Sequence, residues 1–183
     1  MKGIVFSEFL EMVEEVFSLE IADQMLTDVE AELASGGAYT SVGIYDHAEL
    51  VTLVVRLSEI VDIPVPDLVQ AYGKHLFGRF NDLYPIFFEN VSCTFDFLDS
   101  IENHIHIEVR KLYPNAELPT FETTIKTDSR MTMIYRSSRS FADLAAGLID
   151  GAIHHFNENI EVSRASLGAE LGTVEQFSMR RVA

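Results

Sequence analysis

Apolar residues recur at helical spacing through the first part of the chain. The repeating positions are Val5, Phe9, Met12 and Val16. Glutamates occupy the opposite side, so the pattern predicts an amphipathic helix that packs one face on a core. A second, acidic helix is predicted over residues 22–34, where Gly36 and Gly37 follow and end it.

Two further helices are predicted before residue 85. Asp46 and Glu49 resemble a capping box, which opens a helix that runs to Val61. Two prolines in residues 62–66 end this helix, and Pro66 suits the first position of the next one. The apolar side of that next helix consists of Leu68, Tyr72, Leu76 and Phe80.

The pattern changes from helix to strand after Pro119. A long helix is predicted over residues 95–113, before the change. Residues 121–137 are rich in β-branched side chains around a turn and predict a hairpin. A helix over residues 141–156 and a second hairpin within residues 160–182 complete the chain. The fold class is therefore α+β, with a helical N-terminal part over a four-stranded antiparallel sheet that carries packed helices.

Composition narrows the possible partners. A chain of 183 residues with 48% hydrophobic content can bury the core of a single domain, residues 1–183. Its net charge of −16 argues against a nucleic-acid surface and against binding to anionic lipid. The apolar run 50–57 is too short to span a membrane. With one cysteine, Cys93, and no secretory signal in its acidic N-terminus, the protein is expected in the cytoplasm.

Two neighbouring histidines, His104 and His106, suggest a metal site on the long helix. Residues two apart on a helix point about 200° apart, so these two cannot bind the same metal there. His104 shares its face with polar residues, whereas the face of His106 is mixed. The periodicity favours His106 as the inward residue without deciding the matter, and a packing or surface role is the alternative for either histidine.

The motif Tyr135-x-Ser137-x-Arg139 suggests an anion site. Alternate residues of a strand project to one face, which would place two hydroxyls and a guanidinium side by side. Such donors suit a carboxylate or a phosphate, and a solvated strand face is the alternative. The chain contains no G-x-S-x-G, Walker or G-x-G-x-x-G motif, so the catalytic alternatives are weak.

In these motifs the chain resembles the H-NOX family, the heme nitric oxide/oxygen-binding domains, in their stand-alone bacterial form. The matching segments are residues 1–3, 73–77, 106–114, 118–119, 135–139 and 147–151. The resemblance implies heme b, with His106 as the axial iron ligand and His104 as a bystander. It implies that Tyr135, Ser137 and Arg139 bind the heme propionates and that Pro119 presses on the porphyrin. The heme would be buried between a helical subdomain (about 1–65) and a helix/sheet subdomain (about 66–183).

The distal side departs from the oxygen-binding members of the family, which carry a tyrosine where this chain has Leu144. The other distal candidates are also apolar: Val5, Phe9, Leu76, Phe77 and Leu148. Bound O₂ needs a hydrogen-bond donor and NO does not, so the chain is expected to bind NO and CO but not O₂.

The resemblance further implies a sensor that is not an enzyme. Binding of NO would weaken the bond between iron and His106, and the helical part would shift relative to the sheet. The expected partner is a separate histidine kinase or a cyclic-di-GMP synthase or phosphodiesterase. The alternatives are a heme enzyme of the peroxidase type, which would need a distal acid–base group, and a heme-free interaction module.

Overall fold

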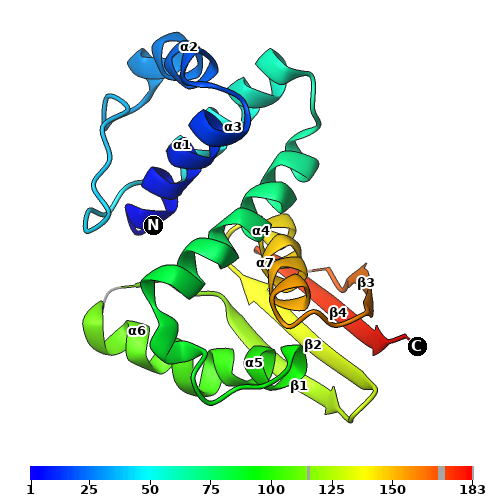
Figure 1. The fold of residues 1–183 in the computed structure, drawn as a ribbon. Helices are drawn as coiled ribbons and strands as arrows, with labels where there is room; N and C mark the ends of the chain where they lie inside the picture. The colour runs from blue at the N-terminus through cyan, green and yellow to red at the C-terminus, as the bar shows by residue number, and fades with distance from the viewer. Residues whose placement is uncertain (115, 169–171, 183) are drawn as a thin grey trace.

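The computed structural model describes residues 1–114, 116–168 and 172–182, in which helices precede and cover a single sheet (Figure 1). The α-helices are α1 (Ile4–Val16), α2 (Leu19–Val29), α3 (His47–Val61), α4 (Val65–Leu83), α5 (Thr94–Ser100), α6 (His106–Leu112) and α7 (Ala142–His155). Short 3₁₀ turns, η1 (Glu30–Glu32) and η2 (Pro85–Phe87), follow α2 and α4, and a π-helical segment, η3 (Ile101–Ile105), joins α5 to α6.

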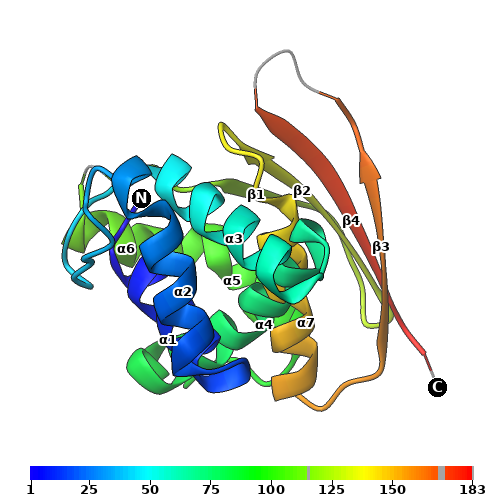
Figure 2. The ribbon, with the colours of Figure 1, turned by 90° about the horizontal axis from the view of Figure 1, so that it is seen from above.

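The sheet contains β1 (Thr120–Lys126), β2 (Arg130–Ser137), β3 (Ile160–Ser166) and β4 (Thr173–Arg181). All neighbours are antiparallel, in the order β1-β2-β4-β3. The helices lie on one face of the sheet (Figure 2), and α5 and α7 share a hydrophobic cluster with it. Met131, Met133 and Tyr135 of β2 alternate toward that face and are at most 2% exposed. The predicted α+β architecture, with its two hairpins, is confirmed.

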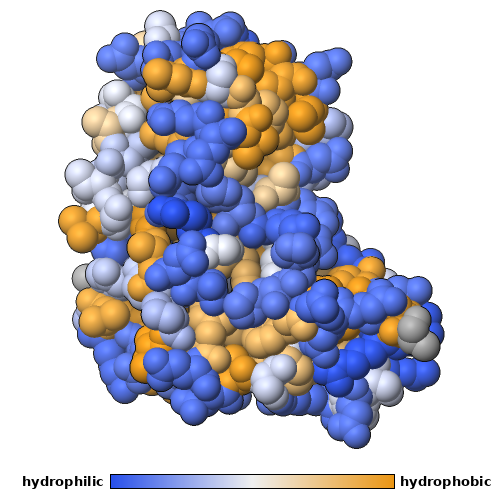
Figure 3. All heavy atoms as spheres, in the orientation of Figure 1, coloured by the Kyte–Doolittle hydropathy of each residue, from blue (hydrophilic) through white to orange (hydrophobic). Residues whose placement is uncertain are grey.

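Two hydrophobic clusters fill the interior. The first joins α1, α2 and α3 to the N-terminal half of α4, and the second lies between α5, α7 and the sheet. The two meet where α4 packs against α7. Figure 3 shows hydrophobic side chains at the surface above and below a band of hydrophilic ones. Helix α4 contributes residues to both clusters, so the clusters do not mark a boundary between two separate parts. The predicted subdomain boundary near residue 65 stays a prediction.

Helices α4 and α7 approach closely because glycines line their crossing. A Cβ atom on Gly147 would lie 2.0 Å from the backbone oxygen of Gln70, and one on Gly73 would lie 2.4 Å from that of Leu144. A Cβ atom essentially never lies this close to an atom to which it is not bonded. The two glycines therefore fix the distance between the helix that begins in the first cluster and the helix that covers the sheet.

Several predicted helix boundaries needed correction. The second helix starts at Leu19 and gives way to a 3₁₀ turn at Glu30, and α4 begins at Val65, so Pro66 is its second residue. Asp46 caps α3 as predicted, because its carboxylate accepts from the Ala48 amide at 3.0 Å. Glu49 does not complete a capping box: its carboxylate instead accepts from the hydroxyls of Ser35 and Tyr39. No helix in the described part of the chain combines the length and hydrophobicity that crossing a membrane requires.

Candidate functional site

The long helix predicted over residues 95–113 is interrupted by a π-helical turn immediately before His106. Residues 94–112 remain helical throughout, but segment η3 widens the helix for five residues. π-Helical turns of this kind often occur at functional sites. His106, the first residue of α6, is 8% exposed, whereas His104 is exposed. The structure thus buries the histidine that the periodicity favoured and leaves the other one in solvent.

The imidazole of His106 is hydrogen-bonded on one side only among the described residues. Its Nδ1 lies 3.0 Å from Oε2 of Glu102, one helical turn earlier. Burial lowers the pKa of His106, and the nearby Glu102 carboxylate only partly offsets this. The ring is therefore neutral at pH 7, with Nδ1–H donating to Glu102 and the lone pair on Nε2. A neutral imidazole in this tautomer is suited to bind a metal through Nε2.

Glu102 also contacts two other groups around His106. Its Oε1 accepts from the guanidinium of Arg110 at 2.8 Å, and its Oε2 accepts from the backbone amide of Phe121 at 3.3 Å. Burial raises the pKa of Glu102, but hydrogen bonds from Arg110 and His106 outweigh it and leave that pKa below its ordinary value. Glu102 was not among the site residues predicted from the sequence. The only signal was its spacing of four residues from His106.

Aromatic side chains connect His106 to the sheet. The ring of Phe121 lies 6.0 Å from the imidazole of His106 and 5.4 Å from the ring of Tyr135, measured between centroids. Phe121 and Tyr135 are cross-strand partners in β1 and β2, so both project to the helix-covered face. Pro119 is partly buried and directly precedes β1, two residues before Phe121.

The predicted anion-binding trio is formed differently from expectation. Tyr135 is buried and Ser137 is partly buried, but β2 ends at Ser137, so the prediction that Arg139 shares a strand face with them is wrong. The backbone amide of Arg139 donates to the Ser137 hydroxyl at 3.0 Å, which turns the chain. The guanidinium of Arg139 contacts the carboxylate of Glu117. Arg139 thus already holds a carboxylate in this structure.

Five of the six predicted distal residues pack in the first hydrophobic cluster. Phe9 and Leu76 are fully buried there, and the partly buried members are Val5, Leu144 and Leu148. The sixth, Phe77, belongs to the second cluster, where its ring lies 5.3 Å from that of Phe97. Tyr72 brings a hydroxyl into the first cluster, but that hydroxyl donates to the backbone oxygen of Val5 at 2.5 Å.

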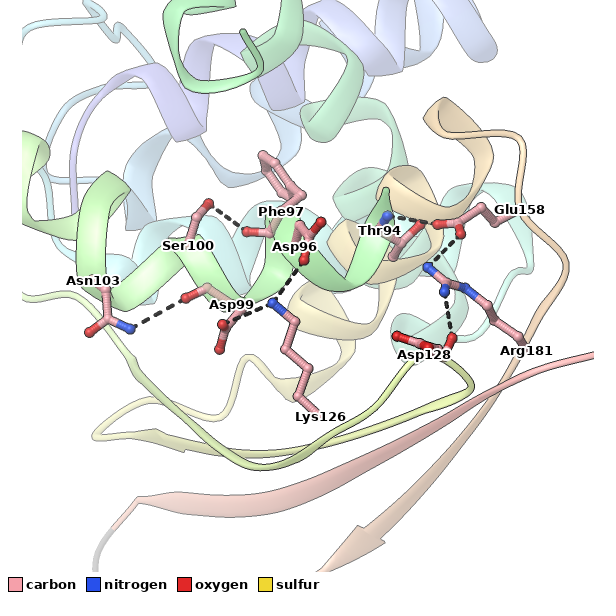
Figure 4. A network of polar contacts seen from close by, with 10 residues as sticks. All are labelled: Thr94, Asp96, Phe97, Asp99, Ser100, Asn103, Lys126, Asp128, Glu158 and Arg181. Carbon is pink, nitrogen blue, oxygen red and sulfur yellow. Dashed lines mark hydrogen bonds and ion pairs between the residues drawn. The ribbon is translucent and has the colours of Figure 1, made fainter. Parts of the chain in front are cut away.

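A network of polar contacts fixes α5, which leads to His106, on the sheet (Figure 4). Lys126 of β1 lies 2.9 Å from Asp96 and 3.0 Å from Asp99, both on α5. At the start of α5, the amide of Thr94 donates to Glu158 at 2.6 Å, and Arg181 of β4 pairs with the same carboxylate at 2.7 Å. The helical run is therefore held at one end by ion pairs and at the other by Glu102.

Metal chemistry at this site depends on one histidine. Within residues 1–114, 116–168 and 172–182, no group of three or more His, Cys, Asp or Glu side chains could hold a metal ion. The site instead offers one neutral imidazole, with the hydroxyl and guanidinium donors of Tyr135, Ser137 and Arg139 at the end of β2. This set suits a metal whose other ligands come from an acidic organic cofactor.

Comparisons with known proteins agree with this description. The model of the haem-NO-binding family matches residues 2–164. The crystal structure of an Fe(II) unliganded H-NOX protein from K. algicida is 41% identical, with a TM-score of 0.91 over 100% of this chain and 97% of that one. The solution structure of an IWP-051-bound H-NOX from Shewanella woodyi in the Fe(II)CO state is also 41% identical, with a TM-score of 0.83 over 100% and 95%.

A more distant structure shares the fold. An H-NOX protein from S. oneidensis in the Fe(II)NO state is 24% identical, with a TM-score of 0.88 over the whole of both chains. No curated protein matched the chain in the sequence comparison.

Proposed function

Because the chain belongs to the haem-NO-binding (H-NOX) family, we propose that it is a nitric oxide sensor whose ferrous heme is ligated by His106. Proteins of this family bind heme and act as sensors without catalysis. The predictions of a heme cofactor and of a protein that is not an enzyme are therefore confirmed.

The residues present fit a heme. His106 offers a neutral nitrogen, because its pKa is lowered by burial and its Nδ1–H is taken up by Glu102. Arg139 already contacts a carboxylate, the chemical group of a propionate, beside the hydroxyl of Ser137. Tyr135, Ser137 and Arg139 would hold the propionates, and Pro119, directly before β1, would contact the porphyrin.

The apolar distal side is the observation that carries the selectivity. Leu144 and Leu148 of α7 pack in one cluster with Leu76 of α4. The tyrosine buried within this cluster, Tyr72, donates its hydroxyl to the Val5 backbone oxygen. The hydroxyls of Tyr39 and Tyr45, which pack against the same cluster, are bonded to Glu49 and to the Thr40 amide. Bound O₂ carries partial negative charge and needs a free donor, whereas NO and CO do not. We therefore propose that the protein binds NO and CO and excludes O₂ as a stable ligand.

Signalling would begin with the release of His106. His106 would hold the heme, which would supply a ferrous iron able to bind NO, and this chain's response would be to free the His106 imidazole. Helix α6 carries His106 at its start and leads to Tyr113, over whose ring the ammonium of Lys2 lies at 3.9 Å. This cation–π contact joins the end of α6 to the N-terminal part, and so provides a route by which movement of α6 shifts that part relative to the sheet.

The output would be read by a separate protein. We propose a sensor histidine kinase or a cyclic-di-GMP synthase or phosphodiesterase as the partner, as the resemblance to stand-alone bacterial members implies. A cytoplasmic location and the division near residue 65 remain predictions.

Absorption spectra of the reduced, heme-loaded protein test this function. We expect distinct spectra under argon, CO and NO, and in air we expect oxidation or no change in place of a stable oxy complex. A stable oxy spectrum in air would refute the selectivity. Failure of the hemin-supplied protein to retain any heme would refute the proposal as a whole.

A further inference from the structure

We infer that Glu102 is a positioning residue for the proximal histidine: it orients the imidazole of His106 and sets the strength of its bond to the iron. This inference rests on the proposed ligation by His106. It is carried by the geometry of one carboxylate, which contacts the imidazole, a guanidinium and the backbone of a strand at the same time.

The first step is the contact with the ring. The 3.0 Å separation between Nδ1 of His106 and Oε2 of Glu102 fixes the tautomer in which Nε2 carries the lone pair. Histidines that bind metals usually donate their other N–H to such an acceptor, which raises the basicity of the ligating nitrogen. A carboxylate does so more strongly than a carbonyl, because it carries charge.

The second step is the control of the carboxylate itself. Arg110 donates to the other oxygen of Glu102 at 2.8 Å and draws negative charge away from the His106 side. The side chain of Arg110 is 42% exposed, whereas that of Glu102 is 27% exposed. Removing the charge of Arg110 should therefore raise the basicity of His106, and removing the charge of Glu102 should lower it.

The third step is the link to the sheet. The Phe121 amide of β1 donates to Oε2, the same oxygen that His106 uses. The orientation of the imidazole is therefore tied to the start of β1 as well as to its own helix. The π-helical segment η3 includes Glu102 and ends at Ile105, directly before His106, so the widened turn is part of this arrangement.

The test compares three variants in the heme-loaded ferrous protein by resonance Raman spectroscopy and redox titration. Glu102→Gln keeps the shape but removes the charge, so the iron–histidine stretching frequency should fall and the midpoint potential should rise. Hemin should also dissociate about tenfold faster. Arg110→Met should shift the frequency and the potential in the opposite directions. Glu108→Gln, on the same helix but paired with Lys111, is the matched control and should change neither.

Each outcome bears on one claim. An unchanged stretching frequency in Glu102→Gln, with histidine ligation intact, would overturn the inference and leave the proposed function untouched. If Glu102→Gln retains no heme, the surface variant Arg110→Met decides: a raised frequency supports the inference, and an unchanged or lowered one overturns it. If wild-type protein shows no iron–histidine band, or if that band persists in His106→Gly, the proposed ligation itself fails.

Discussion

Arg139 and Glu117 form an ion pair between the segment that follows β2 and the segment that precedes β1. One Nη of Arg139 contacts the Glu117 carboxylate, and the other lies 3.4 Å from the Glu117 backbone oxygen. The side chain of Arg139 is 14% exposed and that of Glu117 is 74% exposed. An ion pair with one partner in solvent contributes about 0–1 kcal/mol. The guanidinium can therefore exchange this carboxylate for that of a propionate at little cost.

Arg139→Ala is expected to weaken heme binding. A hydrogen bond to a charged group contributes about 1.5–3 kcal/mol, which corresponds to a loss of roughly tenfold to a hundredfold in affinity. The measurement is a hemin titration of the heme-free protein followed by absorption. Glu117→Gln should leave the affinity unchanged or raise it, because it removes a competitor for the same guanidinium.

Arg136→Ala is the matched control for this substitution. Arg136 lies three residues earlier, pairs with Glu122 at 2.8 Å and is 48% exposed. It alternates with the buried Tyr135 and so projects from the other face of the sheet. If Arg136→Ala weakens hemin binding as much as Arg139→Ala does, the effect comes from net charge, and Arg139 has no specific role.

The two neighbouring histidines give a second test. His106→Gly should abolish proximal ligation, because it removes the buried nitrogen, and the spectrum of the ferrous protein should change unless imidazole is added. His104→Ala should leave that spectrum nearly intact, since His104 is exposed. The absorption spectrum of the reduced protein under argon distinguishes the two. The reverse pattern would refute the assignment of His106.

The periodicity of the sequence predicted most of the fold because most of its elements bury one regular face. Met131, Met133 and Tyr135 alternate along β2, and Phe9 and Met12 repeat along α1, so both patterns are visible without coordinates. The same logic favoured His106 over His104 without deciding between them, and the resemblance to the family assigned the ligand. The predictions from periodicity depend only on local spacing, which the tertiary structure leaves unchanged.

Features that depend on contacts between distant segments could not be predicted in this way. The π-helical turn before His106 breaks no local pattern, and Glu102 gains its role only when the Phe121 amide and Arg110 approach it. Arg139 was assigned to a strand because alternation was extended past Ser137, where the hydrogen bond from the Arg139 amide turns the chain. Phe77 follows Leu76 directly and therefore points to a different cluster.

Leu144→Tyr is expected to introduce some affinity for O₂. Leu144 is partly buried and packs against the first cluster with Leu148, so a tyrosine at this position would add a hydroxyl donor to the cluster, where the hydroxyl of Tyr72 is already bonded to the Val5 backbone oxygen. Leu144→Phe is the matched control, because it adds the ring without the donor. Absorption spectra of both reduced variants in air measure the effect. An oxy spectrum in Leu144→Phe as well would show that the lack of a donor is not what excludes O₂.

The crossing of α4 and α7 predicts a contrast between two glycines. Gly147→Ala should destabilise the protein by about 1–3 kcal/mol, the usual cost of overpacking, because the new Cβ would lie 2.0 Å from the Gln70 backbone oxygen. Gly78→Ala in the same α4 should stabilise it by about 0.5–1 kcal/mol, since Gly78 is exposed and a Cβ there meets nothing within 4 Å. Urea unfolding of the heme-free variants gives both free energies. Equal stability of Gly147→Ala and wild type would mean that the helices can separate freely, and the two glycines would then not fix their distance.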